Sequence, residues 1–284
     1  MRRQLSAQVW PGSRRRIEVR LAFCGFFLAT LFDAGSAGAV RPFVTDDARI
    51  VNKGQLETES FTGMTFSKGG RPGYHLGALQ GFSPTDWMEI IAGGAGLEYH
   101  ESRLSVDDLV LQPKFLLHRS FGAIPSLSAA GGWLFPVSGN RQQWNSYAMA
   151  HASWFLFTPD ESEDPYDNGL AIHVNLGVKS QYDAGQGRYS GKPYWAIGFE
   201  AITWTRELRV LGELFNGDPF VFEEKFPAFQ TGLRWYKTPD LQFDLVWKAA
   251  RDVSDEISAE AGTHARQWNH TIQIGVRFLL ELFR

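Results

Sequence analysis

The chain has 284 residues, of which 44% are hydrophobic and 21% charged, and its formal net charge is -3. This balance argues against the basic excess of nucleic-acid-binding proteins, so no nucleic-acid partner is expected. Aromatic residues reach 14%, with 22 Phe and 10 Trp, and Gly is frequent at 29 residues. Glycine and aromatic residues in this abundance, without long helical periodicity, indicate a barrel.

The first 39 residues have the features of a signal peptide. Arginines at 14–16 precede an apolar run at 21–32, and this run is short for a membrane-spanning helix, which needs roughly twenty residues. The small residues at 37–39 form a cleavage signal, so the mature chain is expected to begin at Val40. The single cysteine, Cys24, falls inside this leader. The interpretations left open are a soluble periplasmic protein, a secreted protein and an outer-membrane barrel.

Residues 40–54 follow the leader and have no regular hydrophobic period. Two interpretations of this segment stay open: a solvated periplasmic arm, or a plug that enters the barrel from the periplasmic side. In the second, the carboxylates of Asp46 and Asp47 would meet Arg234 or Arg277.

Alternating apolar and polar residues fill most of the chain from residue 55 to residue 284. A period of two predicts strands rather than helices. The clearest strand is the last, where Ile272 and Ile274 alternate with Thr271 and Gln273. Pro113 cannot donate to a strand ladder, so we expect a bulge at that position. The predicted strands are 55–66, 74–82, 87–99, 104–118, 125–135, 147–157, 170–179, 194–204, 208–215, 228–236, 241–249 and 270–278.

The lengths of the connections predict a membrane barrel. Connections 83–86, 205–207 and 237–240 are short, whereas 180–193, 216–227 and 250–269 are long, and only the acidic connection 158–168 departs from this alternation. Short periplasmic turns that alternate with long outer loops are typical of outer-membrane barrels, as is tryptophan beside the short turns, here Trp87, Trp204 and Trp235.

We therefore expect an all-β fold, a transmembrane up-and-down antiparallel β-barrel of about twelve strands over residues 55–284. It would lie in the bacterial outer membrane, with lipid as its surroundings. A soluble sandwich or lipocalin-like barrel is the structural alternative, because its strands would show the same two faces. The oligomeric state is left open.

Two motifs resemble a known family. The sequences RPFVTDDA at 41–48 and KGQLE at 53–57 resemble the start of the outer-membrane family named for the MetA pathway of phenol degradation. LRWYKTPDLQ at 233–242 resembles its penultimate hairpin, and VRF at 276–278 resembles the end of its closing strand. The resemblance implies an outer-membrane barrel that transports small solutes, aromatic compounds among them. This chain departs from the family by running on from 279 to 284, a tail beyond Phe278 that the pattern does not explain.

Charged side chains on the polar faces are candidates for a solute path through the lumen. They could form a polar path that selects small solutes, or a paired network that fills the lumen, since buried charges must find partners. Glu57 and Glu59 belong to the same face, and the partner of Arg277 is expected to be Glu57, Glu59 or Asp244. The candidates are Asp108, Lys114, His118, His173, Lys179, Glu200, Arg209, Glu213, Arg234, Asp244, Lys248 and Arg277.

Catalytic signals are weak. His151 and Ser153 share a strand face, as in outer-membrane phospholipase A, but a serine nucleophile also needs a third group to orient the histidine, and none is apparent. No Cys/His spacing suits zinc, and no glycine-rich loop opens a helix, so we expect neither a metal nor a cofactor. The sequence favours a passive channel or transporter for small, hydrophobic or aromatic solutes. The alternatives are a structural barrel with a closed lumen and a lipid-modifying enzyme.

Overall fold

The computed structural model describes residues 43–66, 72–94, 97–100, 103–106, 108–120, 123–137, 143–157, 169–183, 186–220, 225–252 and 267–283. The expected signal peptide and the acidic connection 158–168 lie outside these residues. Every regular element within the described ranges is a β-strand. In the described part of the chain, no helix has the length and apolarity to cross a membrane.

The strands follow one another as antiparallel neighbours. Their bounds are β1 (Gln55–Phe66), β2 (Gly73–Thr85), β3 (Met88–Gly93), β4 (Leu97–His100), β5 (Arg103–Val106), β6 (Leu109–His118), β7 (Ser126–Phe135), β8 (Asn145–Leu156), β9 (Leu170–Asp183), β10 (Arg188–Ile202), β11 (Leu208–Phe215), β12 (Lys225–Thr238), β13 (Leu241–Asp252) and β14 (Gln267–Glu281).

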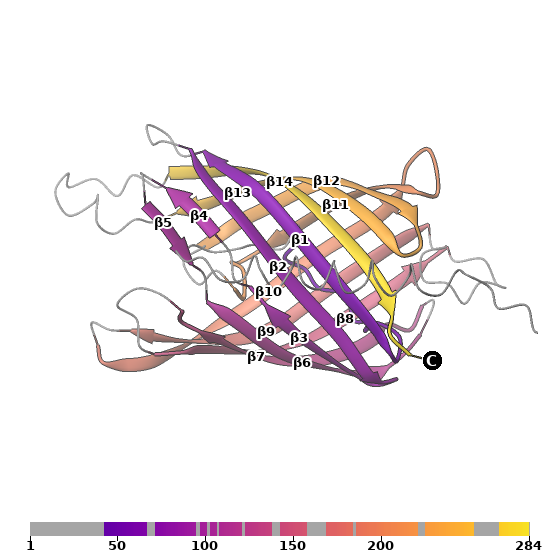
Figure 1. Ribbon diagram of the computed structural model, residues 1–284, viewed down its shortest axis with the longest axis horizontal. Coiled ribbons are helices and arrows are strands. Elements are labelled where there is room, and N and C mark those ends of the chain that lie inside the picture. Colours follow the sequence, from indigo (N-terminus) through magenta and orange to yellow (C-terminus); the bar gives the residue numbers. More distant parts are fainter. Residues whose placement is uncertain are drawn as a thin grey trace, which may run out of the picture. The chain divides into compact units, whose positions relative to one another are not determined.

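Twelve of these strands form a closed ring. The order runs from β1 through β14, β13 and onward to β6, β3 and β2, and β2 pairs again with β1. The β4–β5 hairpin joins the edge of β2 beyond the end of β3 and does not widen the ring. Tilted strands surround the interior on all sides (Figure 1). The twelve-stranded antiparallel barrel predicted from the sequence is confirmed.

The seam between β1 and β14 is long and regular. It runs from the pair Gln55 and Glu281 to the pair Phe66 and His270 without a shift in register. The strand thus continues three residues beyond Phe278, so the first half of the unexplained tail is part of the seam. Beyond it, the Leu282 amide donates to the Gly54 carbonyl at 2.9 Å, which fastens the chain end to the start of β1.

Two of the predicted strands are interrupted. The predicted strand 87–99 is divided into β3 and β4, because Gly93 and Gly94 have φ values of 140° and 83° that end the ladder. The predicted strand 104–118 is also divided, into β5 and β6. The bulge expected at Pro113 is absent: the register with β7 continues past it, and the shift lies between Leu116 and His118.

The side chains divide cleanly between the two faces of the wall. In β14, Ile272 and Ile274 are 49% and 52% exposed, whereas Thr271 and Gln273 are 9% and 1% exposed. The apolar face therefore points outward and the polar face inward, the reverse of a soluble barrel with an apolar core. This is the arrangement of a barrel surrounded by lipid.

Candidate functional site in the barrel interior

The interior contains a piece of the chain besides the strands. We call residues 43–54, which precede β1, the N-terminal segment. Its first residues contact β11, where the amides of Val44 and Thr45 donate to the two carboxylate oxygens of Glu213 at 2.8 and 2.6 Å. Farther on, the Asp46 amide donates to Asn175 Oδ1 at 2.7 Å on β9, and Asn175 Nδ2 donates to the Asp46 carbonyl at 2.7 Å.

The segment then crosses to β8 and β6. The Ala48 amide donates to Ser153 Oγ at 2.8 Å, and Lys114 Nζ donates to the Asp47 carbonyl at 2.7 Å. A backbone without secondary structure can be buried only if its polar groups are bonded elsewhere, and here wall side chains satisfy them. The segment is thus docked against one side of the interior, from β6 to β11.

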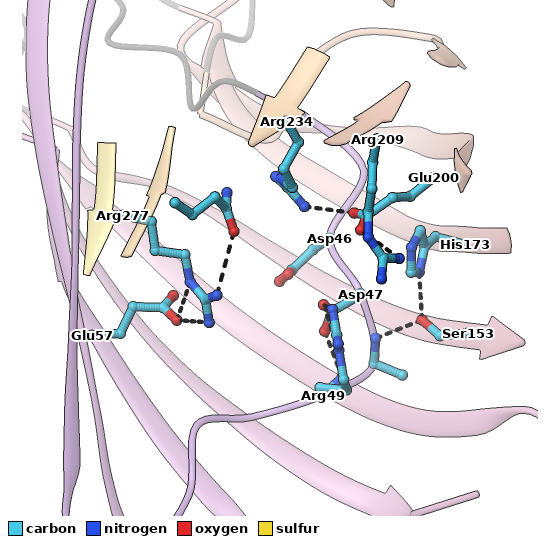
Figure 2. Close-up of polar contacts among 12 residues, drawn as sticks. Asp46, Asp47, Arg49, Glu57, Ser153, His173, Glu200, Arg209, Arg234 and Arg277 are labelled. Atoms are coloured by element: carbon cyan, nitrogen blue, oxygen red, sulfur yellow. Dashed lines mark hydrogen bonds and ion pairs between the residues drawn. The ribbon is translucent and has the colours of Figure 1, made fainter. Parts of the chain in front are cut away.

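The two aspartates of the segment form ion pairs with nearby cations. Asp46 Oδ2 lies 3.0 Å from Lys114 Nζ, and Asp47 pairs with Arg49 of the same segment at 2.6 Å. Burial alone would raise the pKa of the Asp47 carboxyl, but the Arg49 and Lys114 cations outweigh it and hold that pKa below its usual range. Figure 2 shows Asp46, Asp47 and Arg49 between Arg277 on one side and His173 on the other.

Arg234 and Arg277, the expected partners of the aspartates, form ion pairs with wall carboxylates. Arg234 lies 2.7 Å from Glu200 and 2.9 Å from Asp244, and Arg209 also contacts Glu200 at 3.1 Å. These four residues lie on the consecutive strands β10 to β13 and form one continuous charge network. Because each charge lies against an opposite one, the network stiffens this part of the wall.

Arg277 lies at the seam and pairs with Glu57, one of its three expected partners. A second, longer contact of 3.5 Å joins Arg277 to Gln242 on β13. The pair therefore links β14 to β1 across the closure of the barrel. Figure 2 shows Arg277 and Glu57 on the opposite side of the segment from His173 and Ser153.

A cavity of about 470 Å³ remains between the N-terminal segment and the rest of the wall. It borders β1, β2, β3, β13 and β14, the side that the segment leaves uncovered, and reaches Asp240 at a short turn. Glu57, Glu59, Asp46 and Asp47 line it. Of the predicted lumen residues, the structure brings seven to this cavity, namely Lys114, His173, Glu200, Glu213, Arg234, Asp244 and Arg277.

The other five predicted residues lie elsewhere. Arg209 is buried in its ion pair with Glu200, and His118 is exposed at the end of β6, beyond the register shift. Asp108 is partly buried just before β6. Lys179 and Lys248 are buried nearer the end of the barrel with the long loops, where Lys179 Nζ donates to the Asp218 carbonyl at 3.1 Å.

That half of the interior is packed with apolar side chains. The residues after β11 fold inward, so that Gly217, Asp218 and Pro219 are buried. The Phe220 ring meets the Tyr147 ring edge to face, with centroids 5.6 Å apart. Val44 of the N-terminal segment belongs to the same apolar cluster. The N-terminal segment and the residues after β11 therefore both fill part of the interior.

The serine and histidine residues of the interior do not form the pair considered from the sequence. Ser153 Oγ lies 2.8 Å from His173 Nδ1, while His151 Nδ1 lies 3.0 Å from Ser128 Oγ. Ser153 is fully buried beneath the segment, because its hydroxyl also accepts the Ala48 amide. These contacts anchor the segment and leave no open approach to the hydroxyl.

Sequence reasoning did not predict the roles of several residues that matter here. Asn175 and Ser153 anchor the backbone of the segment, Gln230 donates to Glu213, and Glu89 lines the cavity. Their inward face was readable from strand alternation. Their roles were not, because a neutral side chain that anchors a docked segment has no sequence signature of its own.

No protein-family model matches the sequence, and the comparison with curated proteins gives no match. Among solved structures, the COG4313 outer membrane channel from Pseudomonas putida F1 is similar with a TM-score of 0.52 at 9% identity, over 82% of this chain and 98% of that one. The NanC porin gives a TM-score of 0.48 at 12% identity, over 78% of this chain and 98% of that one. The first similarity establishes the fold that the two chains share: an outer-membrane β-barrel.

Proposed function

We propose that this protein is a passive outer-membrane channel for small solutes and that its own N-terminal segment closes the lumen. The observation that carries the proposal is the docking of that segment, whose backbone is bonded by side chains of β6, β8, β9 and β11. A segment held by individual hydrogen bonds, and not by a strand ladder, can leave its site without unfolding the barrel.

Two further points support the proposal. The cavity beside the segment is lined by charged and polar groups, as a solute path requires. The sequence also resembles the MetA-pathway family at 41–48 and 233–242, which implies a transporter of the outer membrane. The similar fold of the COG4313 channel is consistent with this function.

A reversible disulfide across the segment tests the proposal. A Cβ built on Gly198 would lie 3.3 Å from the Thr45 Cβ, close to the roughly 3.5–4.5 Å between the Cβ atoms of disulfides. The double variant Thr45→Cys/Gly198→Cys should conduct ions in planar bilayers when reduced and lose conductance when oxidised. The single variants Thr45→Cys and Gly198→Cys are the controls, since neither can form the bridge within one chain.

Equal conductance of the oxidised and reduced double variant would show that the segment does not gate the channel. The apolar packing of Phe220 against Tyr147 favours a second candidate, a structural barrel whose lumen stays closed. That candidate predicts no conductance in any redox state, and no swelling of liposomes with any small solute.

A lipid-modifying activity fits the interior less well than a channel does. Ser153 and Ser128 are 0% and 1% exposed, and the histidines beside them are buried with them. A nucleophile that attacks a phospholipid needs an open approach to the bilayer. We therefore assign these residues to docking of the segment, and phospholipid hydrolysis that disappears in Ser153→Ala would overturn this assignment.

A further inference from the structure

The cavity wall opposite the N-terminal segment carries a buried carboxylate whose neighbouring cations also pair with other acids. Glu89, on β3, is 4% exposed and lines the cavity, and the cations that attract it, Lys114 and Arg277, also pair with other acids. The cation across the ladder from it, Lys114, is bound to Asp46 and to the Asp47 carbonyl. Removing a carboxylate from water is costly unless a cation compensates it fully, so this position favours an additional positive group.

Gly81 on β2 creates the space that the Glu89 carboxylate occupies. A Cβ at Gly81 would overlap Glu89 Oε1, and it would lie 3.7 Å from the Cβ of Glu57. Because Gly81 has no side chain, Glu89 can lie beside Glu57, and two carboxylates enter the cavity from neighbouring positions. Like charges so close together favour a cation between them or beside them.

The excess of acidic side chains around the cavity also favours a cation. Nine carboxylate side chains line it, against five lysine or arginine side chains. The ion pairs described above engage the cations Arg49, Lys114, Arg234 and Arg277 with other acids, so Glu89 shares Lys114 and Arg277 with those acids. A cationic solute would meet an excess of negative charge throughout the cavity.

The neighbours of the two carboxylates suggest the rest of the ligand. Leu79 and Ile91 are buried, lie two positions from Gly81 and Glu89 on the same strands, and line the same cavity. In the described part of the chain, no group of three or more His, Cys, Asp or Glu could hold a metal ion. A cavity of about 470 Å³ also has room for more than an inorganic ion.

We propose that this cavity binds a small organic cation, whose ammonium or guanidinium group lies against Glu89 beside Glu57 and whose apolar part lies against Leu79 and Ile91. The assignment rests on the proposed function, because it names the class of solute that the channel would hold. It deepens that function without depending on how the segment moves.

Calorimetric binding to the detergent-folded chain tests the assignment with three probes of one shape. Phenethylamine carries a positive charge, 2-phenylethanol is neutral and phenylacetate is negative. Phenethylamine should bind at least about tenfold more tightly than the other two, since hydrogen bonds to a charged group outweigh neutral ones. Glu89→Gln should weaken phenethylamine binding by about ten- to a hundredfold, while Asp86→Asn, which alters an exposed carboxylate of the β2–β3 turn outside the cavity, should leave it unchanged.

Several results would overturn the assignment. Equal binding of 2-phenylethanol would mean that Glu89 is held neutral, and tighter binding of phenylacetate would mean that the site selects anions. Displacement of phenethylamine by Mg²⁺ would identify a metal site, and absence of binding, or equal binding to Glu89→Gln, would remove the site altogether. The probe series needs no variant, so a folding defect of Glu89→Gln does not affect it. Conductance of the disulfide variant is measured separately, so failure of the ligand class and failure of the channel are distinguishable.

Discussion

Glu213 is the residue whose replacement should most directly release the N-terminal segment. Its carboxylate is buried and accepts the amides of Val44 and Thr45 at 2.8 and 2.6 Å. In Glu213→Gln one carboxylate oxygen becomes an NH₂ group. This group cannot accept a hydrogen bond, and it faces a backbone amide that also donates. Hydrogen bonds to charged groups contribute about 1.5–3 kcal/mol each, so losing one should shift the docking equilibrium by about ten- to a hundredfold or slightly more.

Thiol labelling measures that shift. Val44 is 6% exposed, so a Val44→Cys reporter reacts with a bulky maleimide only when the segment leaves its site. In the chain that begins at Val40 this reporter would be the single cysteine. The labelling rate should rise about ten- to a hundredfold in Glu213→Gln, and should not change in the control Glu207→Gln, which alters an exposed turn. An unchanged rate in Glu213→Gln would refute the view that these two hydrogen bonds hold the segment.

Three further predictions concern the interior. Gly198→Val should speed labelling of the same reporter, because a Cβ there would lie 3.2 Å from Thr45 Oγ1, whereas Gly191→Val, with its nearest atom at 3.8 Å, should not. Arg277→Ala should lower the free energy of unfolding in detergent by about 1–3 kcal/mol, a loss between the values for breaking an exposed ion pair and a buried one. Glu57→Gln should lower the free energy of unfolding less in the Arg277→Ala variant than in the otherwise unchanged chain. If the effects of the two substitutions simply add, the two side chains do not form a direct pair. The lowered pKa of Asp47 means that its carboxylate stabilises the fold above the unfolded pKa of roughly 3.9 and loses this effect as the pH falls. The thermal stability lost in Asp47→Asn should therefore be constant from about pH 5 to 8 and should shrink below about pH 4, and a loss that grows in acid would contradict this sign.

Strand alternation predicted the barrel and the inward face because a strand has a strict period of two. It also identified seven of the cavity residues, since each charged side chain on an inward face must enter the lumen. It could not predict that Lys114 and Glu213 bind a backbone 67 and 169 residues away. It also missed Glu89, whose importance comes from Gly81 on the neighbouring strand. Such relations depend on cross-strand register, which no local pattern encodes.

The N-terminal segment behaves as a tethered intramolecular ligand of the barrel. It joins β1 directly at Gly54, whose amide donates to the Ser83 carbonyl at 2.8 Å, so its attachment point is fixed to the wall. Twelve residues reach on the order of 40 Å at full extension. Once undocked, the segment thus stays near its site at a local concentration on the order of millimolar. A free peptide of the same sequence could compete with it only near that concentration, and each opening of the lumen should be brief and self-terminating.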